Sequence, residues 1–112
     1  MERITQEHLY ELLLQLNEDW AVERIALSER DELNVELAYI GQPPLDGHGA
    51  RMTMYDHKPI REWRHLDTMQ YKTILQCRLP RFKDSSGKVH TVEVPWASSG
   101  ERHTSLLEKK SD

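Results

Sequence analysis

Residues 60–97 read IREWRHLDTMQYKTILQCRLPRFKDSSGKVHTVEVPWA, and this stretch decides the fold. Apolar or small side chains alternate with polar ones through its middle. Successive side chains of a strand point to opposite faces, so this period of two predicts a half-buried strand over residues 69–79. One face is expected to be buried and the other exposed. The buried positions are Tyr71, Thr73, Leu75, Cys77 and Leu79, and the exposed ones are Lys72, Gln76 and Arg78.

Further strands are predicted on both sides of this one. Residues 20–29 and 31–41 read as a hairpin around a charged turn at Ser28–Asp31, because the second segment alternates in the same way. Residues 41–59 are rich in Gly and Pro and are expected to form a loop. DSSGK at residues 84–88 is a predicted turn, and residues 89–96 are a predicted last strand that Pro95 stops.

The N-terminal segment carries the signals of a helix. Thr5 is placed to cap the first turn, and Ile4 and Leu9 are spaced as a hydrophobic staple. Leucines follow at helical spacing up to Asn17, which is expected to end the helix. We therefore expect an α+β fold in which one N-terminal helix packs on a small, mainly antiparallel sheet of four or five strands. A single domain over residues 1–97 and a flexible tail over residues 98–112 complete this prediction.

Composition and charge narrow the class of protein. The 112 residues are 38% hydrophobic and 30% charged, which is typical of a globular domain, and no apolar run is long enough to cross a membrane. An acidic N-terminus and the lone Cys77 favour a reducing cytoplasm. The net charge is −4, yet residues 58–88 hold eight basic and three acidic side chains. This local excess is compatible with phosphate binding, or with an ordinary solvated sheet.

Catalytic signatures are missing from the sequence. Histidines and aspartates are available, but no nucleophile elbow, phosphate loop, HExxH or paired-carboxylate pattern fixes their geometry. We expect no enzyme activity and no cofactor.

Four segments together resemble a known family. They are HLYELLLQLNEDWAVERIAL at residues 8–27, YDHKPIREWRHLDTMQYKT at 55–73, RLPRFK at 78–83 and HTVEVPWASSGERHT at 90–104. These segments are similar to the N-terminal region of bacterial insertion-sequence transposases of the ISL-three type. The resemblance implies a zinc-ribbon-like module that helps to bind the ends of the element, ahead of a helix-turn-helix and a DDE-type catalytic domain. Neither of those two further parts is found in this sequence.

The metal ligands implied by the resemblance are also missing. Members of the family carry two knuckles, CPxCG and CPxHG, that supply four zinc ligands. Here the corresponding segments read LDGHG and DSSGK, which places Leu45, His48, Asp84 and Gly87 at the ligand positions. Leu45 and Gly87 have no donor atom in their side chains, whereas DGHG and DSSG are good turn formers. We therefore expect degenerate knuckles closed by turns, with no metal.

The most direct interpretation is a non-catalytic module that binds transposon-end DNA. Its candidate phosphate contacts are Lys58, Arg61, Arg64, Lys72, Arg78, Arg81 and Lys83. Trp63 and Trp96 are either stacking residues or core residues. The alternative is a protein-interaction module, for self-association or for inhibition of a transposase partner. In that case the leucine helix and an acidic surface would carry the contacts, unless the domain is a remnant without function. The acidic residues are Glu11, Glu18, Asp19, Glu23, Glu32 and Glu36.

Overall fold

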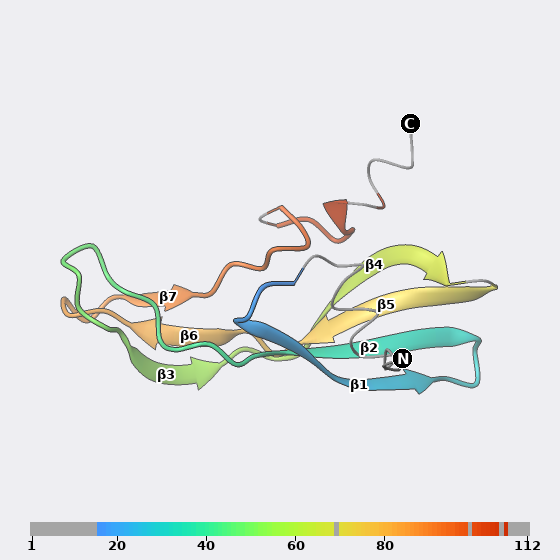
Figure 1. The fold of residues 1–112 in the computed structure, drawn as a ribbon, viewed down its shortest axis with the longest axis horizontal. Coiled ribbons are helices and arrows are strands. Elements are labelled where there is room, and N and C mark those ends of the chain that lie inside the picture. The colour runs from blue at the N-terminus through green and yellow to red at the C-terminus, as the bar shows by residue number, and fades with distance from the viewer. Residues whose placement is uncertain (1–15, 69, 99, 106, 108–112) are drawn as a thin grey trace, which may run out of the picture.

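The computed structural model of the protein describes residues 16–68, 70–98, 100–105 and 107, and these residues form seven strands in two sheets. One sheet has the strand order β1-β2-β5-β4, and the other has the order β3-β6-β7. The two sheets lie end to end along the longest axis of the molecule (Figure 1). The strands are β1 (Trp20–Leu27), β2 (Glu32–Tyr39), β3 (Thr53–His57), β4 (Arg61–Thr68), β5 (Tyr71–Cys77), β6 (Pro80–Lys83) and β7 (Val89–Thr91).

β1 and β2 form the predicted hairpin. The strands pair antiparallel from Trp20 opposite Tyr39 to Leu27 opposite Leu33. Ser28 closes the turn, because its hydroxyl accepts hydrogen bonds from the backbone N–H groups of Arg30 and Glu32. A side-chain oxygen that satisfies turn N–H groups in this way replaces bonds that the ladder cannot supply.

β5 lies in the middle of the four-stranded sheet, as its burial pattern requires. It runs parallel to β2, with Val35 opposite Leu75, and antiparallel to β4, with Trp63 opposite Leu75. Leu75 is fully buried and Cys77 nearly so, while Lys72 and Arg78 are exposed. The predicted strand is therefore confirmed over Tyr71–Cys77 rather than over the whole of residues 69–79. Its two faces agree with the prediction except that Tyr71 and Gln76 are both half-buried.

Two short linkers carry the chain between the sheets. Residues 58–60 join β3 to β4, and Arg78 and Leu79 join β5 to β6. The Lys58 N–H donates to the Leu79 carbonyl at 2.8 Å, which ties the linkers together. Pro80 stands first in β6, where the missing N–H of a proline is tolerated in a sheet. The break between the two sheets thus falls next to Pro80, which cannot donate a backbone hydrogen bond to a neighbouring strand.

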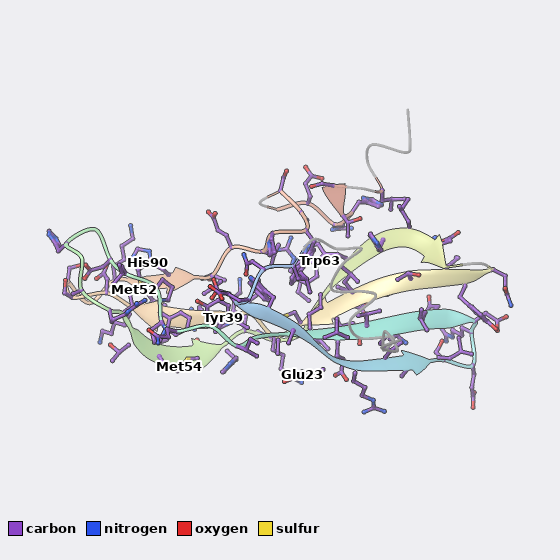
Figure 2. All side chains as sticks on the ribbon, viewed as in Figure 1. Glu23, Tyr39, Met52, Met54, Trp63 and His90 are labelled. Atoms are coloured by element: carbon purple, nitrogen blue, oxygen red, sulfur yellow. The ribbon has the colours of Figure 1, made fainter. Side chains whose placement is uncertain are left out.

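The core lies on one face of the four-stranded sheet. Trp63, Leu75 and Val35 are at most 1% exposed, and the segment after β7 lays Trp96 over them. Trp96 makes edge-to-face contacts with Trp20 and Trp63, with ring centroids 4.9 and 5.2 Å apart. Figure 2 shows Trp63 between the four-stranded sheet and the C-terminal segment. These rings fill the space that a single sheet would otherwise leave open to water.

Residues 102–104 extend the sheet beyond β4. The Arg64 N–H donates to the Arg102 carbonyl, and the Thr104 N–H donates to the Arg64 carbonyl, both at 2.8 Å. Thr104 is 1% exposed, and its Oγ1 lies 2.7 Å from Nδ1 of buried His65. Burial lowers the pKa of His65, and neighbouring Arg64 lowers it further. Part of the segment predicted as a tail is thus bonded to the sheet.

The predicted α+β architecture is wrong for the part of the chain that the structure describes. Its regular elements are the strands of two sheets, and the cover over the core is the 92–97 segment rather than a helix. The predicted helix over residues 5–17 lies outside the described residues except at its end, where residues 16–19 approach β1 through a turn. No described helix is long and apolar enough to cross a membrane.

Three strands of the structure were not predicted from the sequence. β3 lies in the segment expected to be a loop, and β4 and β6 were not expected as strands. β3 shows no alternation, because Met54 and Tyr55 are both exposed, so its pairing with β6 is what defines it. The predicted last strand over residues 89–96 is real only for β7, since the chain after Thr91 leaves the sheet to cover the core.

Candidate nucleic-acid interface

The first knuckle is a turn organised by Asp46. Oδ1 of Asp46 accepts hydrogen bonds from the N–H groups of His48 and Ala50, at 2.8 and 3.0 Å. Gly49 follows with φ of 81°, a conformation that side chains rarely adopt. Aspartate as acceptor and glycine at the left-handed position make this a self-sufficient turn.

The second knuckle repeats this design around Asp84. Oδ1 of Asp84 accepts from the N–H groups of Ser86 and Lys88, both at 2.9 Å, and Gly87 has φ of 91°. Oδ2 lies 2.7 Å from Nε2 of His90. The hydrogen bond from the Ser86 hydroxyl and that from His90 hold the pKa of Asp84 well below its usual range.

A side-chain contact joins the two knuckles. The Ser85 hydroxyl and N–H both donate to Oδ2 of Asp46, at 2.7 and 3.2 Å. The bond from the Ser85 hydroxyl, helped by those from the His48 and Ala50 amides, lowers the pKa of Asp46 to about 2. An ionised carboxylate thus bridges the two turns at neutral pH, and charge-assisted hydrogen bonds of this kind are stronger than neutral ones.

The residues at the implied metal positions do not fit a zinc ion. Leu45 is exposed, Gly87 has no side chain, and the carboxylate of Asp84 already accepts from its own turn and from His90. Structural zinc needs four nitrogen or sulfur donors, or carboxylates in their place. Among the described residues, no three His, Cys, Asp or Glu side chains converge as ligands. The described geometry around His48 therefore supports a hydrogen-bonded turn, and we derive no role for a metal.

The predicted basic residues do not form one patch. Lys58 and Arg61 line the same groove at the junction of the two sheets. Lys72 lies on the outer face of the four-stranded sheet, away from the core, and Arg78 is exposed in the linker after β5. Lys83 lies at the end of β6 next to the second knuckle.

Two of the predicted arginines are held by carboxylates. Arg81 donates from Nε to Oδ1 of Asp56 at 2.6 Å and from Nη2 to Oδ2, and its guanidinium lies 5.3 Å from the centre of the Tyr55 ring. The bonds from Arg81 lower the pKa of Asp56. Arg64 forms an ion pair with Asp67. Both arginines therefore have an acidic partner already, which weakens the field they present to a phosphate.

The outer face of the four-stranded sheet carries mixed charge. Lys72 lies opposite Glu32 in the β2–β5 register, and Glu36 and Glu62 both lie opposite Gln76, between Lys72 and Arg78 along the sheet. The amide of Gln76 donates to Glu62 at 2.6 Å. Opposite charges alternate here as on an ordinary solvated sheet, so this face gives little attraction to DNA.

The tryptophans are core residues. Trp63 is 1% exposed and Trp96 is 3% exposed, so neither ring is available for stacking on a base. Their role in the interface is indirect, because the guanidinium of Arg61 lies 4.8 Å from the centre of the Trp63 ring. The alternation of Arg61, Trp63 and His65 on one face of β4 was the signal from which this contact could have been predicted.

Residues of the groove outside the basic set escaped the sequence analysis. Thr91, Glu93 and Ser98 line it beside Lys58 and Arg61. Thr91 and Glu93 lie in the segment predicted as the last strand, and Ser98 lies in the segment predicted as a tail. No sequence pattern predicts that these residues line a groove, because the groove forms only where the chain leaves the sheet after Thr91.

Comparison with known proteins adds one match. Residues 43–83 match the family model described as the zinc-finger of transposase IS204/IS1001/IS1096/IS1165. The matched segment contains the first knuckle and strands β3 to β6, and it ends immediately before Asp84. No curated protein and no solved structure matches the chain.

Proposed function

We propose that this domain is a non-catalytic, transposase-derived module that binds the DNA at the ends of a transposable element. The observation that carries the proposal is the match of residues 43–83 to a transposase zinc-finger, a segment that also holds all seven candidate phosphate contacts. Zinc-finger modules position protein on nucleic acid through contacts to phosphate, so the basic side chains of this segment are the natural contacts.

The distribution of charge supports an interface at the sheet junction and the knuckle end. Five of the seven candidate contacts form no ion pair with a described residue, whereas Arg64 and Arg81 do. The five are Lys58, Arg61, Lys72, Arg78 and Lys83, of which Lys72 lies opposite Glu32 in the sheet. Free cations attract phosphate most strongly, and the acids of the N-terminal third weaken that attraction at long range. DNA is therefore expected to approach along the β3–β6 side, away from β1.

The knuckle turns supply the scaffold for this interface. In the transposases that the sequence resembles, a zinc ion is expected to hold two knuckles together, and here the Asp46–Ser85 bridge joins the turns at those positions. If the two knuckles keep their positions, the strands between them, which carry the basic side chains, also keep theirs. We infer that metal was replaced by side-chain hydrogen bonds without loss of the DNA-facing surface.

Matched charge variants test the proposal. Arg78→Gln and Lys83→Gln each remove one exposed cation, and Glu32→Gln removes one half-buried acid that lies opposite Lys72 in the four-stranded sheet. Fluorescence anisotropy with a labelled duplex should show weaker binding for the first two on every sequence, because phosphate contacts carry little sequence information. Unchanged affinity in both, together with a protein partner lost on charge reversal at Glu32 and Glu36, would replace the proposal with the interaction module.

A further inference from the structure

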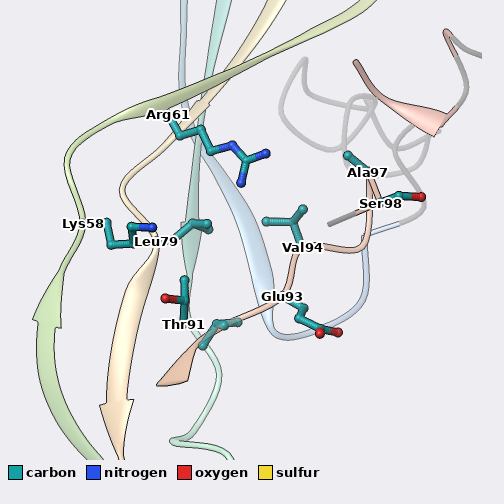
Figure 3. Close-up of a pocket in the computed structure, with 9 residues that line it drawn as sticks. Lys58, Arg61, Leu79, Thr91, Glu93, Val94, Ala97 and Ser98 are labelled. Carbon is teal, nitrogen blue, oxygen red and sulfur yellow. The ribbon is translucent and has the colours of Figure 1, made fainter. Parts of the chain in front are cut away.

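A groove of about 530 Å³ lies where the linkers between the two sheets meet (Figure 3). The linker before β4 supplies Lys58, the start of β4 supplies Arg61, and the segment after β7 supplies the opposite wall. In Figure 3 the side chains of Lys58 and Arg61 extend into the groove, toward Leu79 and Val94. The groove thus brings together two cations separated by only two residues in the chain.

Arg61 is held in place before any ligand arrives. Its guanidinium lies over the Trp63 ring, and Nη2 donates to the Glu101 carbonyl at 2.8 Å. These contacts fix the plane of the guanidinium and leave its other N–H groups without a partner among the described residues. A fixed, planar fork of donors suits the oxygens of a phosphate, and little side-chain entropy is lost on binding.

Lys58 faces the same space from a fixed backbone. Its N–H donates to the Leu79 carbonyl, and its ammonium pairs with no described acid. Two cations at one site attract an anionic phosphate strongly and bind a neutral group poorly. The exposed hydroxyls of Thr91 and Ser98 add donors at the rim.

Glu93 and the aliphatic side chains of the lining restrict the kind of ligand that the groove can bind. The carboxylate of Glu93 lines the groove, so a second anionic group would meet repulsion there. Leu79, Val94 and Ala97 give the groove apolar walls. Such walls are better suited to contact the carbon atoms of a sugar than to contact further charged groups of a ligand. None of the described residues that line the groove is aromatic, so these residues offer no ring on which a base could stack.

We propose that this groove is a binding site for one phosphate group, with Arg61 and Lys58 as its ligands, and that it seats one backbone phosphate of the bound DNA. The inference rests on the proposed function for the source of the phosphate. The other exposed cations then supply general attraction, whereas the groove fixes the register of the protein on the duplex.

The test uses the full chain, inorganic phosphate and a labelled duplex. Arg61→Gln removes the fork, Arg61→Lys keeps the charge but not the fork, and Lys83→Gln is the control with the same loss of charge outside the groove. Phosphate should shift the amide resonances of Thr91 and Ser98 in a saturable manner in the wild type and not in Arg61→Gln. DNA affinity should fall about tenfold or more in Arg61→Gln, less in Arg61→Lys and least in Lys83→Gln.

The outcomes separate this inference from the proposed function. DNA binding that Arg61→Gln and Lys83→Gln weaken equally, with phosphate shifts scattered over the surface, would overturn the groove and leave the DNA-binding module standing. Saturable phosphate binding in the groove without DNA affinity would uphold the site, with free phosphate as its ligand, and overturn the proposed function. Urea midpoints of the variants equal to that of the wild type verify that each comparison is made on folded protein.

Discussion

Thr104→Val should destabilise the protein, because it removes a hydroxyl from a buried contact while keeping the shape of the side chain. Thr104 is 1% exposed, and its hydroxyl lies 2.7 Å from Nδ1 of His65, which is itself 5% exposed. The same Oγ1 accepts a 3.3 Å bond from the Leu107 N–H. Leaving the buried imidazole nitrogen without this partner costs about 1–3 kcal/mol, and the weaker second bond adds about 0.5 kcal/mol.

Equilibrium urea denaturation measures this loss. A total of about 1.5–3.5 kcal/mol, with a slope of about 1–2 kcal/mol per molar urea, lowers the midpoint by about 1–3.5 M. Thr53→Val is the matched control, since Thr53 is exposed and its hydroxyl makes only a 3.5 Å contact with the Lys83 carbonyl. It should change stability by less than about 0.5 kcal/mol. If Thr104→Val were as neutral as this control, the docking of residues 102–104 on β4 would not contribute to stability as argued.

Three further predictions concern the knuckles and the core. A chelator should leave the thermal midpoint unchanged, because Leu45 and Gly87 supply no ligand; unfolding on chelation of a stoichiometric zinc ion would contradict this. The pKa of Asp46 is lowered to about 2, so its bridge to Ser85 should stabilise the knuckles fully above about pH 4 and be lost as the pH falls toward 2. Amide exchange of the knuckles should follow that window in the wild type, and an unchanged profile in Asp46→Asn would exclude Asp46 as the cause. Leu75→Ala should cost about 2–5 kcal/mol by urea denaturation, because Leu75 is fully buried between two paired strands; a loss below about 1 kcal/mol would mean that the core is not centred there.

The sequence predicts best those elements whose side chains alternate in burial. β5 and the middle of β2 follow this rule, because one face of each strand contributes buried side chains to the core and the other is less buried. β3 does not follow it, since Met54 and Tyr55 are both exposed and the strand depends on pairing with a distant segment. β6 does alternate, with Pro80 and Phe82 buried, but its four residues are too short a run to be recognised as a strand. Local periodicity carries no information about such pairing.

The division of the strands into two sheets could not be predicted from the sequence either. It depends on the linkers at Lys58 and Leu79 meeting in space, and on the 92–97 segment covering the core in place of a strand. The same meeting creates the groove, so the sequence predicted Lys58 and Arg61 as phosphate contacts but not the walls around them. The turns of the knuckles, in contrast, could be predicted from the sequence, because Asp46 and Asp84 each begin a short motif that contains glycine.

The salt dependence of DNA affinity tests the central claim most directly. A labelled duplex carrying the terminal repeats that flank the gene should be titrated with the wild-type protein at two salt concentrations. If the free cations contact phosphates, the logarithm of the affinity falls against the logarithm of salt by about 0.9 for each phosphate neutralised. A slope of about −2 to −4 corresponds to about two to four phosphates neutralised by the candidate cations that form no ion pair with a described residue. No measurable binding at the lower salt concentration, or an affinity that does not change with salt, would contradict the account.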